Sequence, residues 1–189
     1  MEREIRFGVI GAGGFARFAV GEFVKVPDTK LVGVYDELEA NADALRKIDS
    51  TVHIHDSLDA LLQDTSIDLV YIGTPPYLHY PQSKAALLAG KHVICEKPAA
   101  IKLEHAVELQ TLAKEKDILF VVNLMQRYNP LYAAVTQLIQ QKVLGEFLHG
   151  FFENYASDEY LKEDHWFWDL KKSGGIFIEH GVHFFDMFE

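Results

Sequence analysis

The sequence is poor in cysteine, in basic charge and in long apolar runs. It has one cysteine, Cys95, which excludes an internal disulfide and favours a reducing compartment. No apolar run approaches the roughly 18 residues that span a membrane, and no repeat or low-complexity tract occurs. The first residues, Met1-Glu2-Arg3-Glu4, lack an apolar signal segment. We therefore expect a cytoplasmic protein that does not bind membranes.

Basic residues are also scarce, and this bears on the partners. Acidic residues outnumber Lys and Arg by 28 to 18, which gives a formal net charge of -10. Nucleic acids and anionic membranes need clustered positive charge, so neither is expected as a partner. The 49% hydrophobic content of the 189 residues suffices for one full domain and part of another. We expect a small-molecule substrate and a homo-oligomer.

The first two thirds of the chain alternate short β-rich runs with segments of helical length. This rhythm is typical of right-handed crossovers, which place parallel strands in a sheet covered by helices on both faces. We predict an α/β fold, a Rossmann-type doubly wound parallel sheet, over residues 1–122. The predicted strands are 5–10, 31–35, 52–55, 69–72, 92–95 and 119–122, and the predicted helices are 15–26, 39–47, 58–63, 80–89 and 103–116.

The pattern changes after Val122. A helix is predicted from Asn129-Pro130 to about Val143, followed by a long strand over 146–155 and an aromatic segment over 160–170. Ser173-Gly174-Gly175 then opens a terminal helix. Residues 123–189 thus predict the incomplete N-terminal part of a second α+β domain for substrate binding and oligomerisation, whose single strand leaves a sheet edge uncovered.

The strongest motif is a glycine turn after the first strand. Gly11 permits a tight strand-to-helix turn, Gly13 lets a diphosphate approach the backbone, and the small Ala16 lets the helix pack closely on the sheet. Gly14 and Phe15 lie between them and are assigned to the same dinucleotide site. The alternative is a doubly wound domain whose site is empty.

Asp36 ends the second strand, twenty residues after Ala16. A carboxylate there can accept hydrogen bonds from a ribose hydroxyl and would repel a 2′-phosphate, and Glu37 follows it instead of a neutralising arginine. NAD is therefore predicted in preference to NADP. The alternative is that Asp36 is only a turn residue.

Two further segments follow strands that end at the ligand-binding edge of the sheet. Thr74, Pro75 and His79 belong to a turn stiffened by prolines, and Glu96 and Lys97 precede Pro98. The Lys97 ammonium could hold a substrate hydroxyl and stabilise charge on its oxygen. A cis Lys97-Pro98 bond is allowed. The alternative for Lys97 is a solvated surface side chain.

The terminal helix, Ile176 to Phe188, is apolar on nearly every side, and we expect it to be buried. Glu179, His183 and Asp186 fall on one of its faces. His183 could accept a proton, with Glu179 orienting its ring, or it could be a satisfied core histidine. A metal site formed by Glu179, His180, His183 and His165 is the other alternative, but the order of ligands does not match zinc proteases. No metal is predicted.

These motifs together, in this order, resemble the glucose-fructose oxidoreductase, inositol dehydrogenase and rhizopine catabolism (Gfo/Idh/MocA) family. The resemblance extends over the whole chain through Gly11-x-Gly13-x-x-Ala16, Thr74-Pro75-x-x-x-His79, Glu96-Lys97-Pro98 and a final Gly-Gly helix motif that contains Glu179 and His183. Members have a Rossmann domain and a second α/β domain, and mostly oxidise or reduce sugars and polyols with NAD(P). They are considerably longer than this chain, so a fragment or a natural truncation is implied.

The resemblance implies catalytic roles for Lys97, His183 and Glu179, where the family usually has aspartate in place of Glu179. It implies substrate contacts for Lys97, Arg127, Trp166, Glu179 and His183, and cofactor contacts for Gly11, Gly13, Gly14, Phe15, Ala16, Asp36, Thr74, Pro75, His79, Glu96 and Lys97. The expected function is NAD-dependent hydride transfer to or from a secondary alcohol or carbonyl. The alternatives are a sensor that binds NAD or a sugar without turnover, and an assembly scaffold.

Overall fold

The computed structural model describes residues 4–151, 153–155 and 160–188 of the chain. The chain divides into two compact units, Met1–Asn123 and Leu124–Glu189. Among the described residues, no helix combines the length and the apolar character that crossing a bilayer requires.

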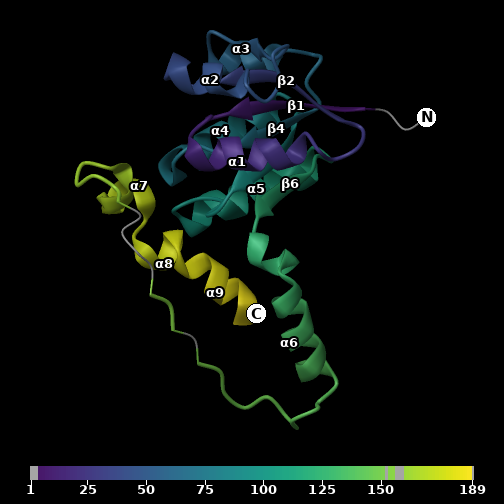
Figure 1. Cartoon of the computed structure of the whole chain (residues 1–189), viewed down its shortest axis with the longest axis vertical. Helices are drawn as coiled ribbons and strands as arrows, with labels where there is room; N and C mark the ends of the chain where they lie inside the picture. The colour runs from purple at the N-terminus through teal and green to yellow at the C-terminus, as the bar shows by residue number, and fades with distance from the viewer. Residues whose placement is uncertain (1–3, 152, 156–159, 189) are drawn as a thin grey trace. The chain divides into compact units, whose positions relative to one another are not determined.

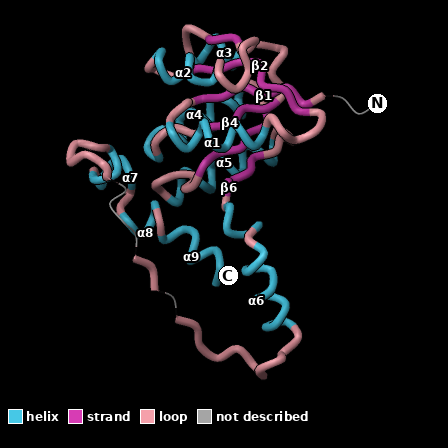
Figure 2. Tube along the Cα trace, viewed as in Figure 1, coloured by secondary structure: helices cyan, strands magenta, loops and turns pink. Residues whose placement is uncertain are grey.

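The first unit is built on a six-stranded sheet with strand order β3-β2-β1-β4-β5-β6. All neighbouring strands pair in parallel, and Figure 2 shows them in magenta between helices. Order and direction are those of a doubly wound Rossmann-type sheet, so the predicted fold class is confirmed. The strands are β1 (Ile5–Ile10), β2 (Thr29–Tyr35), β3 (His53–Ile54), β4 (Leu69–Ile72), β5 (His92–Glu96) and β6 (Phe120–Asn123).

Helices cover both faces of the sheet (Figure 1). Alternation along β4 shows the two sides: Tyr71 packs in the cluster that includes α1 and α2, whereas Val70 and Ile72 pack in the one that includes α3, α4 and α5. Burial on both faces explains why the strands read as nearly continuous apolar runs. The helices are α1 (Gly14–Phe23), α2 (Glu39–Leu45), α3 (Leu58–Gln63), α4 (Pro76–Leu88) and α5 (Leu103–Glu115).

The start of α4 differs from the prediction. The sequence predicts a proline-stiffened turn that reaches His79 and a helix from Tyr80, but the helix begins at Pro76. Proline suits the first helical position because the amide hydrogen it lacks would have no partner inside the helix. The turn is therefore shorter than predicted, and His79 lies on the first turns of a helix.

The second unit is helical in its described residues. Asn129 caps α6 by accepting a hydrogen bond from the Leu131 amide at 2.9 Å, and Pro130 opens the helix. The predicted strand over 146–155 is wrong for residues 146–151 and 153–155, which form no strand, and residue 152 lies outside the described residues. A strand needs a neighbour to pair with, and none lies beside this run in the described part. The elements are η1 (Met125–Tyr128), α6 (Pro130–Gln140), η2 (Trp166–Trp168), α7 (Leu170–Ser173), α8 (Ile176–Glu179) and α9 (Gly181–Phe188).

The terminal helix also differs from the prediction. It is divided at His180 into α8 and α9, next to Gly181, a weak helix former. The prediction that this helix is buried is wrong for several of its aromatic side chains, since Phe177 is 74% and Phe185 is 63% exposed. Within the described part of this unit there is no sheet on which they could pack.

The β1 to α1 turn generates a prediction about stability. Gly11 has φ +83°, and a Cβ there would lie 2.5 Å from Thr74 Cγ2 and 2.8 Å from Thr74 N. Gly11→Ala should therefore lower the free energy of unfolding by at least about 2 kcal/mol, measured by urea denaturation. Gly14→Ala is the matched control, because no described atom beyond its chain neighbours and the α1 backbone lies within 4 Å of its added Cβ, and it should leave stability unchanged or slightly raised. Equal losses in the two variants would contradict this account of the turn.

Candidate functional site

The backbone of the glycine turn is open at Gly13 and Gly14, whereas Gly73, which follows β4, is closely packed. No described atom lies within 4 Å of a Cβ built on Gly13, whereas one built on Gly73 would lie 2.8 Å from Ala16 Cβ. Ala16 is fully buried, so its small side chain allows α1 to approach the end of β4. Gly13 caps α1, whose first amides have no partners inside the helix. This arrangement suits an anionic group resting on the helix N-terminus.

Asp36, which follows β2, is tied directly to this turn. Its Oδ2 accepts a hydrogen bond from the Ala12 amide at 2.7 Å. Its Oδ1 accepts one from the Leu38 amide at 2.8 Å and one from Asn41 Nδ2 at 3.2 Å. The carboxylate thus serves as a turn residue and is also held at the tip of β2, beside the glycine turn.

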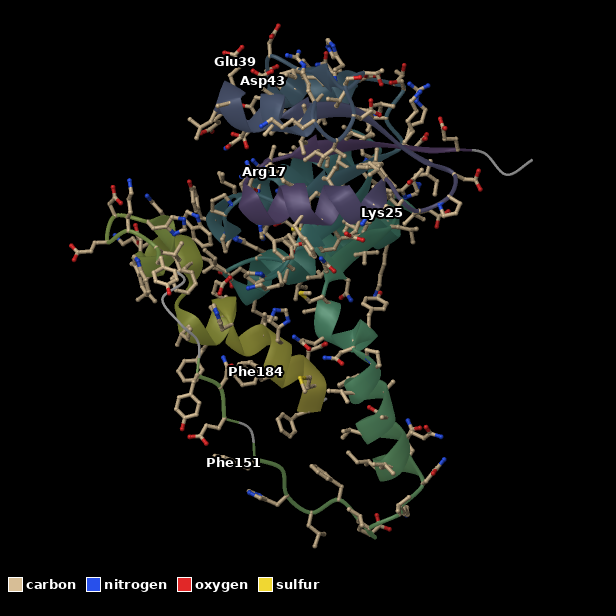
Figure 3. All side chains as sticks on the ribbon, in the orientation of Figure 1. Arg17, Lys25, Glu39, Asp43, Phe151 and Phe184 are labelled. Atoms are coloured by element: carbon tan, nitrogen blue, oxygen red, sulfur yellow. The ribbon has the colours of Figure 1, made fainter. Side chains whose placement is uncertain are left out.

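Arg17 is a residue of this site that the sequence reasoning missed. Its Nη1 donates to the Ala12 carbonyl oxygen at 3.1 Å, so the two polar groups of Ala12 are held by Asp36 and Arg17. Figure 3 shows Arg17 on α1. A cation directly after Ala16 was the available signal, because a guanidinium at the start of such a helix can donate to phosphate.

His79 holds two of the predicted loops together. Its ring is 1% exposed, with Nε2 2.6 Å from the Thr74 carbonyl oxygen and Nδ1 2.7 Å from the Pro98 carbonyl oxygen. Thr74 is fixed further, because its hydroxyl donates to Gln82 Oε1 at 2.6 Å. Thr74, Pro75 and His79 are thereby brought to one place, with the histidine beneath the loops.

Glu96 and Lys97 lie at the end of β5. Glu96 Oε1 accepts hydrogen bonds from the Tyr71 hydroxyl at 2.8 Å and from Asn123 Nδ2 at 2.7 Å, which links β4, β5 and β6. Lys97 follows, half-buried, and the Lys97-Pro98 bond is cis. Glu96, held by Tyr71 and Asn123, thus fixes the backbone next to Lys97, and we call these three residues the Glu96 brace.

Burial dominates the electrostatics of this brace. It raises the pKa of Glu96, against the opposing hydrogen bonds from Asn123, Tyr71 and the Lys97 backbone and the attraction of the Lys97 charge. Burial likewise raises the pKa of the Tyr71 phenol, and the neighbouring Glu96 raises it further. Tyr71 therefore stays neutral and donates to the carboxylate.

In the second unit, Arg127 is paired with Asp186. The guanidinium Nε donates to both carboxylate oxygens, at 2.8 and 3.0 Å, and Nη2 donates to Oδ1. The Asp186 side chain is 8% exposed. This two-pronged pair ties η1 to α9 and compensates the charge of both residues.

Glu179 lies in a small cavity of the second unit. The cavity has a volume of about 200 Å³ and is lined by Trp168, Glu179 and the residues Phe167, Leu170, Ser173, Gly175 and Ile176. The Glu179 carboxylate contacts His180 Nδ1. Trp166 is part of η2 but is not among the lining residues. The cavity therefore combines aromatic rings with one buried carboxylate.

The predicted residues fall into two groups. The first unit contains all the predicted cofactor contacts and Lys97, and the second contains Arg127, Trp166, Glu179 and His183. Among the described residues, no group of three or more His, Cys, Asp or Glu side chains is arranged to hold a metal ion. A larger groove of about 670 Å³ lies between α5 and β6 and is mainly apolar.

Comparison with known proteins adds to this geometry. The profile of the GFO_IDH_MocA family, described as an oxidoreductase family with an NAD-binding Rossmann fold, matches residues 5–124. The scyllo-inositol 2-dehydrogenase (NAD(+)) of Bacillus subtilis (strain 168) is 28% identical over 188 residues, which cover 99% of this chain and 54% of that protein. The chain thus spans about half the length of this relative.

Solved structures are similar over nearly the whole chain. An NAD-binding protein from Listeria innocua matches with a TM-score of 0.80 and 26% identity, covering 98% of this chain and 54% of the other. The biliverdin reductase of Synechocystis sp. PCC 6803, solved with biliverdin and NADP+, matches with a TM-score of 0.79 and 27% identity, covering 98% and 57%.

The raised pKa of Glu96 predicts a pH-dependent contribution to stability. The folded pKa lies above the unfolded value of about 4.3, so the folded state binds the proton more tightly. The contribution of Glu96 to the free energy of unfolding therefore falls as the pH rises from the unfolded pKa through the folded pKa. In Glu96→Gln the contribution is absent. The free energy of unfolding of the variant minus that of the wild type should therefore increase as the pH rises from well below the unfolded pKa of about 4.3 to above the folded pKa, by about 1.4 kcal/mol per unit of raised pKa.

The measurement is urea denaturation at a series of pH values. Any constant loss of hydrogen bonding in Glu96→Gln cancels, because only the slope with pH is compared. Glu115→Gln, at the exposed end of α5, controls for the removal of a surface charge. A flat difference for Glu96→Gln would show that burial does not raise the pKa of this carboxyl.

Proposed function

This chain belongs to the Gfo/Idh/MocA oxidoreductase family, and from that premise we propose that it is an NAD-dependent oxidoreductase. Its substrate would carry a secondary alcohol or a carbonyl group, as a sugar, a polyol or a related compound does. The inositol dehydrogenase relative supports a polyol. The chain spans about half the length of that relative, and a shared fold alone does not establish a shared activity, so this activity is a proposal.

The observation that carries the proposal is the open glycine turn beside Asp36. A diphosphate would rest on the first amides of α1, over the open backbone at Gly13, and Asp36, which is held by the Ala12 amide, would accept hydrogen bonds from the adenosine ribose. Arg17, which donates to the Ala12 carbonyl oxygen, would lie close to the diphosphate. Since Asp36 is anionic and Glu37 follows it, NAD fits this position better than NADP. The Synechocystis relative was solved with NADP+, so the preference of this chain for NAD over NADP is a matter for direct measurement.

The remaining roles concern proton transfer and orientation. NAD, when bound, would supply the hydride acceptor. Lys97 would donate to the substrate oxygen and stabilise its charge, and His183 would take or return the hydroxyl proton. Glu179 would orient the histidine, and Arg127 and Trp166 would help to shape the substrate pocket. The Glu96 brace supports this proposal by fixing the backbone next to Lys97.

The cofactor assignment predicts a change of preference in Asp36→Ser. The variant should bind NAD about tenfold more weakly, because a charged hydrogen bond to ribose is lost, and should bind NADP no worse than the wild type. Isothermal titration calorimetry with both dinucleotides measures this. Glu39→Ser, at an exposed position on α2, is the control. Unchanged affinities of Asp36→Ser for both cofactors would remove Asp36 from the ribose site.

The proposed catalytic roles predict variants that lose turnover but keep their affinity for NAD. Lys97→Ala and His183→Asn should each lower the rate of NAD reduction, measured across a panel of polyols and sugars, by about a hundredfold or more. NAD affinity should stay within a few-fold of the wild-type value. Full retained turnover, or loss of NAD binding together with turnover, would contradict these roles. A wild-type chain that binds NAD but turns over no member of the panel would favour a sensor.

A further inference from the structure

Asp36 is not the only hydrogen-bond acceptor at the tip of β2, because the side chain of Asn41 contacts it. We propose that Asn41 is a second residue of the ribose site and a determinant of cofactor choice, with its side-chain carbonyl accepting a hydrogen bond from one ribose hydroxyl. The inference rests on the proposed dinucleotide function and goes beyond it, because neither the glycine motif nor Asp36 requires a residue at this position.

Asp36 has a limited capacity to accept hydrogen bonds. A carboxylate has about four lone-pair sites, two on each oxygen. Oδ1 already accepts from the Leu38 amide and from Asn41 Nδ2, and Oδ2 accepts from the Ala12 amide. One site, on Oδ2, remains. An adenosine ribose presents two neighbouring hydroxyls, so Asp36 alone can accept a hydrogen bond from only one of them.

The contact with Asp36 fixes the orientation of the Asn41 amide. A carboxylate oxygen only accepts hydrogen bonds, so the amide group that faces Asp36 at 3.2 Å must be the NH2 group. The carbonyl Oδ1 of Asn41 is then directed away from Asp36 Oδ1. Among the described residues, no hydrogen-bond donor to this oxygen is found. The half-buried Asn41 side chain, held against Asp36, thus keeps a neutral acceptor that no described donor occupies.

The 2′-phosphate of NADP would be disfavoured by both acceptors. A phosphate at that position cannot donate to either acceptor and would face the Asp36 charge and the Asn41 carbonyl dipole together. The acidic residues nearest in sequence, Glu37 and Glu39, do not relieve this repulsion, and Figure 3 shows Glu39 and Asp43 on the same helix. A ribose diol satisfies both acceptors. The pair Asp36 and Asn41 would therefore discriminate more strongly than Asp36 alone.

If Asn41 had only a structural role, it would hold Asp36 in place and would not contact the ribose. The two roles separate in a double-mutant cycle that pairs a change in the protein with a change in the ligand. NAD is compared with its 2′-deoxyadenosine and 3′-deoxyadenosine analogues, each lacking one hydroxyl. The protein is wild type, Asn41→Ala or Asn41→Leu. Leucine keeps the shape of the amide without its polar atoms, so the result does not depend on the folding of a single variant.

Calorimetry on the whole chain should give three results. Wild type should bind NAD more tightly than NADP, Asn41→Ala and Asn41→Leu should each bind NAD roughly five- to tenfold more weakly, and NADP affinity should not fall. For one of the deoxy analogues the Asn41 variants should bind as tightly as wild type, because the contact is already absent. Gln63→Ala, which removes an exposed amide at the end of α3, should change none of these affinities.

The outcomes that overturn the inference are distinct from those that overturn the function. If wild type binds neither dinucleotide, the proposed function fails. If wild type binds NAD and the Asn41 variants weaken NAD and both deoxy analogues by the same factor, Asn41 acts as a brace and the proposed contact is wrong. If the variants bind NAD as wild type does, Asn41 has no part in the site.

Discussion

The hydrogen bond from the Ala12 amide to Asp36 is the interaction on which the candidate site depends. It joins the turn after β1 to the tip of β2, the two places at which a dinucleotide's diphosphate and ribose would rest. Arg17 holds the carbonyl of the same residue from α1. Because both polar groups of Ala12 are occupied, the turn has little freedom to close over Gly13. The open space over Gly13 therefore depends on the hydrogen bonds that hold Ala12 as well as on the absence of a side chain at Gly13.

A second set of buried polar contacts fixes the neighbouring strand ends. His79 joins the Thr74 loop to the Pro98 loop, and Glu96 joins Tyr71 to Asn123. Buried polar groups are costly when unpaired and rigid when satisfied, so each of these side chains limits how far the loops can move. These contacts preorganise this edge of the sheet, and they fix the backbone next to Lys97.

Much of the first unit could be predicted from the sequence because its signals are local. Apolar runs separated by helical segments specify a parallel sheet, and Gly11 and Asp36 mark the edge at which sheets of this kind bind ligands. The start of α4 differs from the prediction because two adjacent prolines are typical of a turn, although Pro76 suits the first position of a helix. The roles of His79 and Asn41 depend on contacts between segments that sequence spacing does not reveal. In the second unit, the run over 146–155 has strand propensity but no pairing partner among the described residues, and propensity does not form a strand without one.

The central claim is that the turn from Gly11 to Ala16 receives a dinucleotide. The most direct test is an amide NMR titration of the chain with NAD, followed by hydrogen exchange on the complex. The account predicts that the amide resonances of Gly13, Gly14 and Phe15 shift on titration and that their exchange slows, because these amides would then donate to the diphosphate. Shifts confined to residues away from the turn, or unchanged exchange at Gly13 and Gly14 under saturating NAD, would contradict it.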